Sequence, residues 1–243
     1  MYLFKDDIDR ISFVWWSKKY IESKQWAALP PAAKAIYPVI AIHCNKKGFS
    51  YPSERTIAIL SGRTDKVVRQ GIRYLEDYLG DSFKTVKYTS KRGKQSNRFI
   101  LKIPVYQKGE TFPFYRWIFE SGIWRELKPT AQALYPVMRS FGYYSPDAYE
   151  EAAEKIETTQ TWDMEAYKSR EYDLCEADNT VLCEYAGITS RSLNSALKSL
   201  EDNFLIENDS DSSWRVYLRT KDHTTWKRSY LNEKIQRAYN HTK

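Results

Sequence analysis

Four polar side chains between positions 66 and 73 have the types and the spacing to contact one surface together. Lys66, Arg69, Gln70 and Arg73 fall at i, i+3, i+4 and i+7, which places them on one face of a helix. Guanidinium and carboxamide groups match the hydrogen-bonding edges of guanine and adenine. The central pair, Arg69 and Gln70, are therefore candidates for contacts with bases. Lys66 and Arg73, nearer the flanks, are candidates for contacts with phosphate.

A cluster of positive charge follows this segment. Residues 84–102 contain seven Lys or Arg and no Asp or Glu, and apolar residues alternate on either side of a turn at 91–97, as in a β-hairpin. Solvation alone could explain such a hairpin, but seven unpaired cations repel one another unless an anion is expected. The pattern therefore favours contact with a phosphate backbone or a minor groove. The predicted phosphate-contacting residues are Lys84, Lys87, Lys91, Arg92, Lys94 and Arg98.

Two short helices are predicted to position these side chains. Ser53 and Thr64 are typical N-terminal caps and predict helices over 54–60 and 65–78. Gly62 between them can adopt the positive φ of a sharp reversal. The apolar residues of the second helix form one buried face: Val68, Ile72 and Leu75. A helix pair joined by a glycine turn, with polar residues outward on the second helix, is the helix-turn-helix arrangement.

The chain contains an internal repeat. The fifteen residues from Trp26 to Ile40 recur 98 positions later, from Trp124 to Met138, with eight identical residues. Weaker matches extend the copies to roughly 12–104 and 111–219. We therefore predict an internal duplication, with a first domain over 1–104 and a second over 105–219.

Each copy is predicted to begin its helix pair after a longer helix, which spans 31–43 in the first copy. Pro38 inside this helix, and Pro136 at the equivalent position, predict a kink in both. His43 lies on the apolar stripe of the helix and is expected to be a hydrogen-bonded structural histidine. A short strand is expected over 49–52.

The second copy keeps the predicted scaffold but has a different surface. Its second helix, beginning at Thr189, carries Arg191 and Asn194 outward as candidates for base contacts, and Lys198 as a candidate for a phosphate contact. The tip of its hairpin contains Asp209 and Asp211, which phosphate would repel.

Two further segments have open roles. An insert over about 142–172 separates the first helix of the second copy from its helix pair, and 146–157 within it is predicted to be helical. The insert could be a partner-docking arm, a dimer contact or a loop with no role. The basic tail over 220–243 is predicted to be helical, and either packs on a domain or extends along phosphates.

Charge is distributed unevenly. The net charge is +11 for residues 1–104, −8 for 105–219 and +4 for 220–243. This asymmetry predicts that the first copy binds a polyanion, whereas the second has a weaker or more selective nucleic-acid contact and a protein-facing surface.

Catalytic patterns are not found in the sequence. It has no phosphate-binding glycine loop and no histidine pair of the kind that metal-dependent nicking enzymes use. Cys44, Cys175 and Cys183 are expected to be reduced thiols of a cytoplasmic protein. No run of eighteen apolar residues predicts a membrane span, and the first residues do not resemble a secretory signal. No enzymatic activity, cofactor, metal or small-molecule substrate is expected.

The helix pair over 53–76 and the basic hairpin behind it resemble the winged-helix DNA-binding proteins. Two such units in tandem are similar to the replication initiators of plasmids and phages. The resemblance implies an α+β, mainly helical fold with two winged-helix domains. It also implies that both domains grip successive major grooves of double-stranded DNA at an origin repeat.

Three functions are compatible with these features. The first is sequence-specific duplex DNA binding by a replication initiator of a plasmid, phage or mobile element. A transcriptional regulator would use the same surfaces. A tandem winged-helix adaptor would work through protein contacts, but it has no need of the cationic hairpin. A homodimer or a replisome protein is the partner expected for the second domain.

Overall fold

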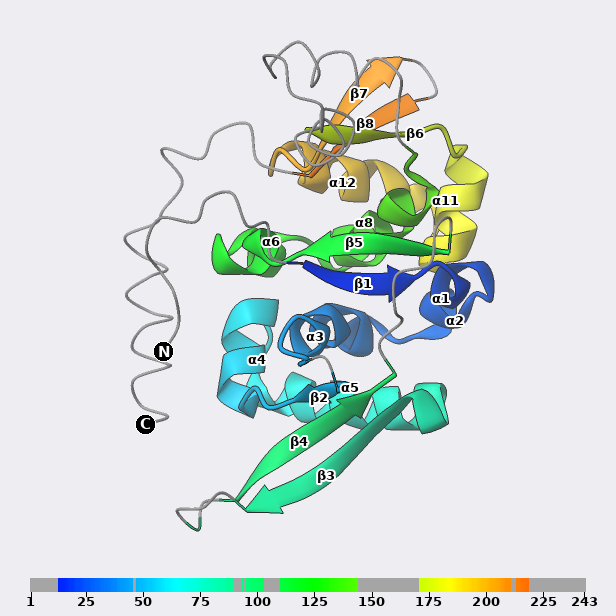
Figure 1. The fold of residues 1–243 in the computed structure, drawn as a ribbon. Coiled ribbons are helices and arrows are strands. Elements are labelled where there is room, and N and C mark those ends of the chain that lie inside the picture. Colours follow the sequence, from blue (N-terminus) through cyan, green and yellow to red (C-terminus); the bar gives the residue numbers. More distant parts are fainter. Residues whose placement is uncertain are drawn as a thin grey trace, which may run out of the picture.

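The computed structural model describes residues 13–45, 47–89, 93, 95–102, 110–143, 171–210 and 213–218. About half of these residues are helical, and the strands form three small antiparallel sheets (Figure 1). The predicted mixed α+β class is therefore confirmed.

Apart from one 3₁₀ turn in the first half, the described helices and strands of the two halves follow the same order. The first half contains β1 (Phe13–Ser17), α1 (Lys19–Glu22), α2 (Gln25–Ala28), α3 (Pro31–Ala41), β2 (Phe49–Ser50), α4 (Glu54–Ser61), α5 (Asp65–Leu79), a 3₁₀ turn (Gly80–Ser82), β3 (Phe83–Thr89) and β4 (Gln95–Leu101). The second half contains β5 (Thr111–Tyr115), α6 (Trp117–Glu120), α7 (Ile123–Glu126), α8 (Pro129–Phe141), β6 (Tyr172–Cys175), α11 (Asn179–Ala186), α12 (Ser190–Glu201), β7 (Ile206–Ser210) and β8 (Ser213–Tyr217). Each half has one three-stranded sheet, in the order β2-β4-β3 or β6-β8-β7.

The predicted helix pair of the first half forms with its predicted caps. The Ser53 hydroxyl accepts a hydrogen bond from the backbone N–H of Thr56 at 3.0 Å, and the Thr64 hydroxyl accepts one from Val67 at 3.4 Å. Gly62 ends α4 with a φ of +69°. These contacts satisfy amide groups that the first turn of a helix leaves without partners.

The helix before this pair is shorter than predicted. α3 ends at Ala41, and His43 follows in a turn. His43 Nδ1 donates a hydrogen bond to the carbonyl oxygen of Val39 at 2.8 Å. Burial lowers the pKa of His43 to about 4, because removal from water disfavours the charged imidazolium. Its structural role is therefore as expected, although it lies outside the helix.

An approximate two-fold axis relates the halves at the pairing of β1 with β5. Trp15 pairs with Pro113, its own equivalent in the repeat, and Phe13 pairs with Tyr115 while Ser17 pairs with Thr111. Residues on either side of the centre therefore exchange partners, as in an isologous dimer contact. These two strands lie at the middle of the molecule, between the halves (Figure 1).

Reciprocal tryptophan contacts continue this symmetry. Trp26 Nε1 donates a hydrogen bond to the carbonyl oxygen of Ala133 at 2.8 Å, and the equivalent Trp124 donates one to Ala35 at 2.9 Å. Both indoles are buried, and α2 contacts α11 as α7 contacts α4. The apolar residues of both halves form one continuous core, so the halves resemble a fused dimer. The predicted boundary after residue 104 falls in 103–109, outside the described residues.

Glycine is required where the halves meet. A Cβ atom on Gly62 would lie 2.5 Å from the carbonyl oxygen of Arg125, and one on Gly187 would lie 2.2 Å from that of Ala27. Both glycines also have positive φ, which other residues rarely adopt. Glycine thus permits the same close backbone approach on both sides of the axis.

A buried lysine in the first half and a buried glutamine at the equivalent position of the second half both bond to backbone carbonyls. Lys34, which is 3% exposed, donates hydrogen bonds from Nζ to the carbonyl oxygens of Ala27 at 2.9 Å and Ala186 at 2.8 Å. The equivalent Gln132 makes two similar bonds with an uncharged amide, to the carbonyl oxygens of Trp124 at 2.7 Å and Ser61 at 3.3 Å. Burial lowers the pKa of Lys34 to about 8.

Replacing Lys34 with glutamine is expected to raise the free energy of unfolding at pH 7 by about 1–2 kcal/mol. The folded-state pKa lies below the unfolded value, so the folded protein binds fewer protons between the two. Wild-type stability therefore rises as the pH increases from about 8, and the variant lacks this rise. Urea unfolding at pH 7 and pH 9.5 measures both effects. A variant that is less stable than wild type at pH 7 would show that the buried charge of Lys34 does not destabilise the folded protein.

None of the helices in the described part of the chain combines the length and apolar character needed to cross a lipid bilayer.

Candidate nucleic-acid interface

The predicted polar face of α5 is exposed. Lys66, Arg69, Gln70 and Arg73 all lie at the surface, while the opposite face packs against α3. The approach of the two helices is close at Gly71, where a Cβ atom would lie 2.7 Å from Ile36 Cδ1 and 3.0 Å from a backbone oxygen of α3. This packing holds the polar row outward along a rigid helix.

A line of polar contacts joins α5 to the hairpin through the start of α4. Glu54 accepts a contact from Arg69 NH1 at 3.5 Å through one carboxylate oxygen and a hydrogen bond from Asn97 Nδ2 at 3.2 Å through the other. Asn97 Oδ1 in turn accepts a hydrogen bond from Lys87 Nζ at 2.9 Å. Arg69 and Lys87 are therefore positioned by one shared carboxylate and amide.

Gln70 makes a local contact within the same helix. Its amide nitrogen donates a hydrogen bond to the Tyr74 hydroxyl, one turn later, at 2.7 Å. This contact directs the carboxamide along the exposed face of α5.

The predicted phosphate-contacting residues of the hairpin divide between the two sides of its sheet. Lys87 lies on the side of the buried Phe83 and Phe99, together with Asn97. Strand alternation puts Lys84 and Arg98 on the other side. The three residues at the tip, Lys91, Arg92 and Lys94, lie outside the described residues.

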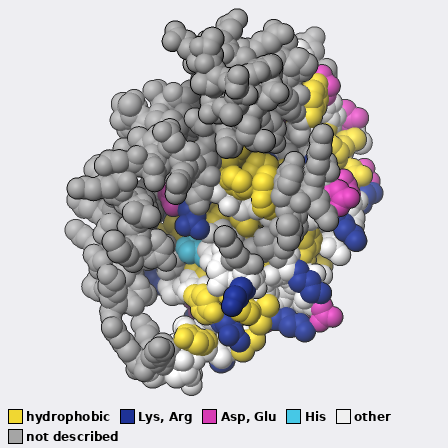
Figure 2. Space-filling view, viewed as in Figure 1, with side chains coloured by type: hydrophobic (Ala, Val, Ile, Leu, Met, Phe, Trp, Pro, Cys, Tyr) yellow, Lys and Arg dark blue, Asp and Glu magenta, His cyan; other side chains and the backbone are white. Residues whose placement is uncertain are grey.

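Lys84 and Arg98 make contacts of their own on that other side. Lys84 forms an ion pair with Asp81 at 2.8 Å, and the Arg98 guanidinium lies 5.1 Å from the ring centre of Phe49. Figure 2 shows Lys and Arg side chains next to hydrophobic ones in the lower part of the molecule, where Figure 1 places β2, β3 and β4. Neither residue therefore joins the polar row of α5.

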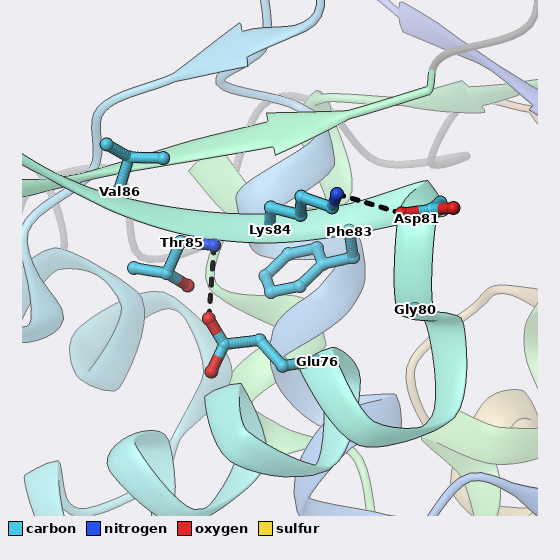
Figure 3. Close-up of a pocket in the computed structure, with 7 residues that line it drawn as sticks. All are labelled: Glu76, Gly80, Asp81, Phe83, Lys84, Thr85 and Val86. Carbon is cyan, nitrogen blue, oxygen red and sulfur yellow. Dashed lines mark hydrogen bonds and ion pairs between the residues drawn. The ribbon is translucent and has the colours of Figure 1, made fainter.

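Glu76 fixes the hairpin against the second half of α5. Its carboxylate accepts a hydrogen bond from the backbone N–H of Thr85 at 3.1 Å. β3 is at the edge of its sheet, so this amide would otherwise have no strand partner. Figure 3 shows this bond between β3 and α5 among the residues that line a pocket, with Phe83 pointing from β3 toward α5 and Val86 pointing away.

The corresponding face of the second half is also exposed. Arg191, Asn194 and Lys198 lie at the surface of α12, which packs on α8 as α5 packs on α3. The β3–β4 hairpin, which follows α5, and the β7–β8 hairpin, which follows α12, lie at opposite ends of the molecule, on either side of the β1–β5 pair (Figure 1).

The acidic hairpin of the second half neutralises part of its own charge. Asp209 forms an ion pair with Arg215 Nε at 2.6 Å and accepts a hydrogen bond from the Ser213 hydroxyl at 3.2 Å. Asp211 lies outside the described residues. The described part of this hairpin therefore presents no excess of cations comparable with that of the first half.

The ends of the predicted insert meet at one place. Tyr143 and Leu174 exchange two backbone hydrogen bonds of 2.9 Å, so the described residues on the two sides of 144–170 lie next to each other. Buried Arg139 anchors this region through Asp173 at 2.8 Å and the carbonyl oxygen of Pro113 at 3.2 Å. The helix predicted over 146–157 and the basic tail both fall outside the described residues.

Sequence reasoning missed three residues of this interface: Glu54, Asn97 and Glu76. Each connects elements whose mutual placement is set by tertiary packing, so no local pattern identifies them. Within the described residues, no group of three or more His, Cys, Asp or Glu is placed to hold a metal ion.

Comparisons with protein-family models, with curated proteins and with solved structures give no match to this chain.

Proposed function

We propose that this protein binds duplex DNA sequence-specifically through two tandem winged-helix units, as a replication initiator of a plasmid, phage or mobile element. The observation that carries the proposal is the exposed row on α5, held beside a cationic hairpin by the contacts of Glu54 and Asn97. A helix of this kind fits the major groove, and the adjoining hairpin fits the phosphate backbone.

Arg69 and Gln70 are the proposed base-reading residues of the first unit. Lys66 and Arg73 flank them at the ends of the row, where the phosphate strands border the groove. Lys87 adds a cation from the hairpin on the same side, through its contact with Asn97. The second unit contributes Arg191 and Asn194, with Lys198 beside phosphate.

The approximate two-fold axis supports a DNA ligand, because duplex DNA has local two-fold symmetry of its own. The halves differ in charge, however, with net values of +11 and −8 for residues 1–104 and 105–219. The first unit therefore supplies most of the electrostatic affinity. The acidic second unit presents the surface for a second copy or a replisome protein.

The first test is binding of the full chain to random-sequence duplex DNA over a series of salt concentrations, measured by fluorescence anisotropy. Substituting alanine for Lys91, Arg92 and Lys94 is expected to weaken binding to every sequence. The salt slope should fall by about 2–3, because the slope reflects the counterions released on binding and each phosphate contact accounts for about one of them. A variant that keeps the wild-type slope would exclude the hairpin tip as a phosphate contact. No binding by the wild-type chain at low salt would favour a protein-interaction adaptor.

Glu54 provides a second test, because it places a carboxylate between two proposed DNA-contacting elements. Replacing Glu54 with glutamine removes a charge that repels phosphate and loosens the hold on Arg69. Affinity for random duplexes is expected to rise about two- to fivefold. Discrimination in favour of a selected site is expected to fall by a similar factor. An increase in discrimination would show that Glu54 does not position Arg69 for base recognition.

A transcriptional regulator would use the same residues. Binding to iterated repeats supports replication initiation, whereas binding to a single site near a promoter supports regulation.

A further inference from the structure

The side of the β2-β4-β3 sheet that faces away from α5 forms a second surface. Strand alternation places the side chains of this outer sheet face opposite the buried Phe83, Phe99 and Leu101. Its residues include Phe49, Tyr51, Lys84, Val86, Tyr88 and Arg98.

Aromatic rings are unusually exposed on this face. Tyr51 and Tyr88 are 46% and 37% exposed, and their rings meet edge to face with centroids 5.7 Å apart. In the sheet of the second half, by contrast, Tyr172 and Tyr217 are only 4% and 3% exposed. Contiguous exposed apolar side chains commonly mark a binding surface, so the difference indicates a function particular to the first half.

The charges on this sheet select an anionic ligand. Strands β3 and β4 contain cations, and β2, β3 and β4 contain no Asp or Glu. Asp81, a carboxylate beside this face, is already paired with Lys84. Figure 2 shows Lys and Arg interleaved with hydrophobic side chains in this region. A partner must therefore combine negative charge with flat apolar groups.

We propose that the outer sheet face binds single-stranded nucleic acid. Tyr51 and Tyr88 offer rings on which unpaired bases stack, while Lys84 and Arg98 lie beside them to meet phosphates. A duplex does not fit this role, since its bases are already stacked on each other. The inference goes beyond duplex recognition, because α5 lies on the opposite side of the sheet and both ligands can bind together.

The experiment compares binding of the full-length protein to labelled oligo(dT), to oligo(rU) of equal length and to a duplex, all by fluorescence anisotropy. Substituting alanine for both Tyr51 and Tyr88 is expected to weaken single-strand binding at least about tenfold and to change duplex binding less than about twofold. Phenylalanine at both positions keeps the rings and should keep the affinity. Tyr78→Ala is the matched control, because Tyr78 is an exposed tyrosine on α5.

Several outcomes would overturn the proposal. The alanine pair could bind oligo(dT) and oligo(rU) as tightly as wild type, or Tyr78→Ala could lose as much affinity. Wild-type protein that binds the duplex but neither single strand would also refute it, leaving the duplex function intact. Single-strand binding without duplex binding would support this surface and refute the duplex function. Thermal unfolding of each variant confirms that its fold is retained, and the ratio of the two affinities shows which of the two single strands is preferred.

Discussion

Replacing Trp124 with alanine is expected to lower the free energy of unfolding by about 3–5 kcal/mol. The indole is fully buried and contacts the rings of Phe114 and Phe119, with centroids 5.8 and 5.3 Å away. Its removal leaves a cavity and also removes the hydrogen bond to Ala35. Because domains have only about 5–15 kcal/mol of net stability, this one change should remove a large share of the free energy of unfolding.

The shared core predicts how this loss appears. Chemical unfolding should remain one transition, shifted for the whole chain, since Trp124 donates its hydrogen bond across the axis to the other half. Trp124→Phe is the control: it keeps a large ring and should cost less, about 1–2 kcal/mol. If the variant instead unfolded in two steps, with one half as stable as in the wild type and only the other half destabilised, a common core would be contradicted.

Replacing Arg69 and Gln70 together with alanine is expected to reduce discrimination between a selected DNA site and a scrambled one about 10²-fold. A well-formed bidentate contact with a base contributes about 1–3 kcal/mol of discrimination, and two such contacts are removed. Binding to random duplexes should persist with a nearly unchanged salt slope, because neither residue is assigned to a phosphate contact. Competition anisotropy with both duplexes measures the ratio.

Arg55→Ala is the matched charge control for this pair. Arg55 is an exposed arginine on α4, outside the polar row of α5, so its loss should lower general affinity without changing the ratio. Equal loss of discrimination in both proteins, or unchanged discrimination in the double variant, would remove α5 from the role of recognition helix.

The local features of this fold follow from the sequence, because they depend on neighbouring residues. Ser53 and Thr64 cap the two helices at the predicted positions, Gly62 makes the turn, and the 3.6-residue period separates the buried and exposed faces of α5. The repeat indicates that the second half would contain the same elements, as it does.

The missed features depend on contacts between distant residues or on very short elements. β1 and β5 are apolar on both sides, so they lack the alternation that reveals a strand, and they pair about 98 positions apart. Helices of four residues, such as α1 and α2, are too short to show a period. The line from Arg69 through Glu54 to Asn97 depends on how α4, α5 and β4 pack, which no local pattern specifies.

The most direct measurement is selection of bound duplexes by the full-length protein from a random-sequence pool. The account predicts strong enrichment of one motif, whose recognition is lost when Arg69 and Gln70 are both alanine. Two results would contradict it. One is the absence of any bound duplex at low salt. The other is a bound pool that shows no sequence enrichment over the starting pool.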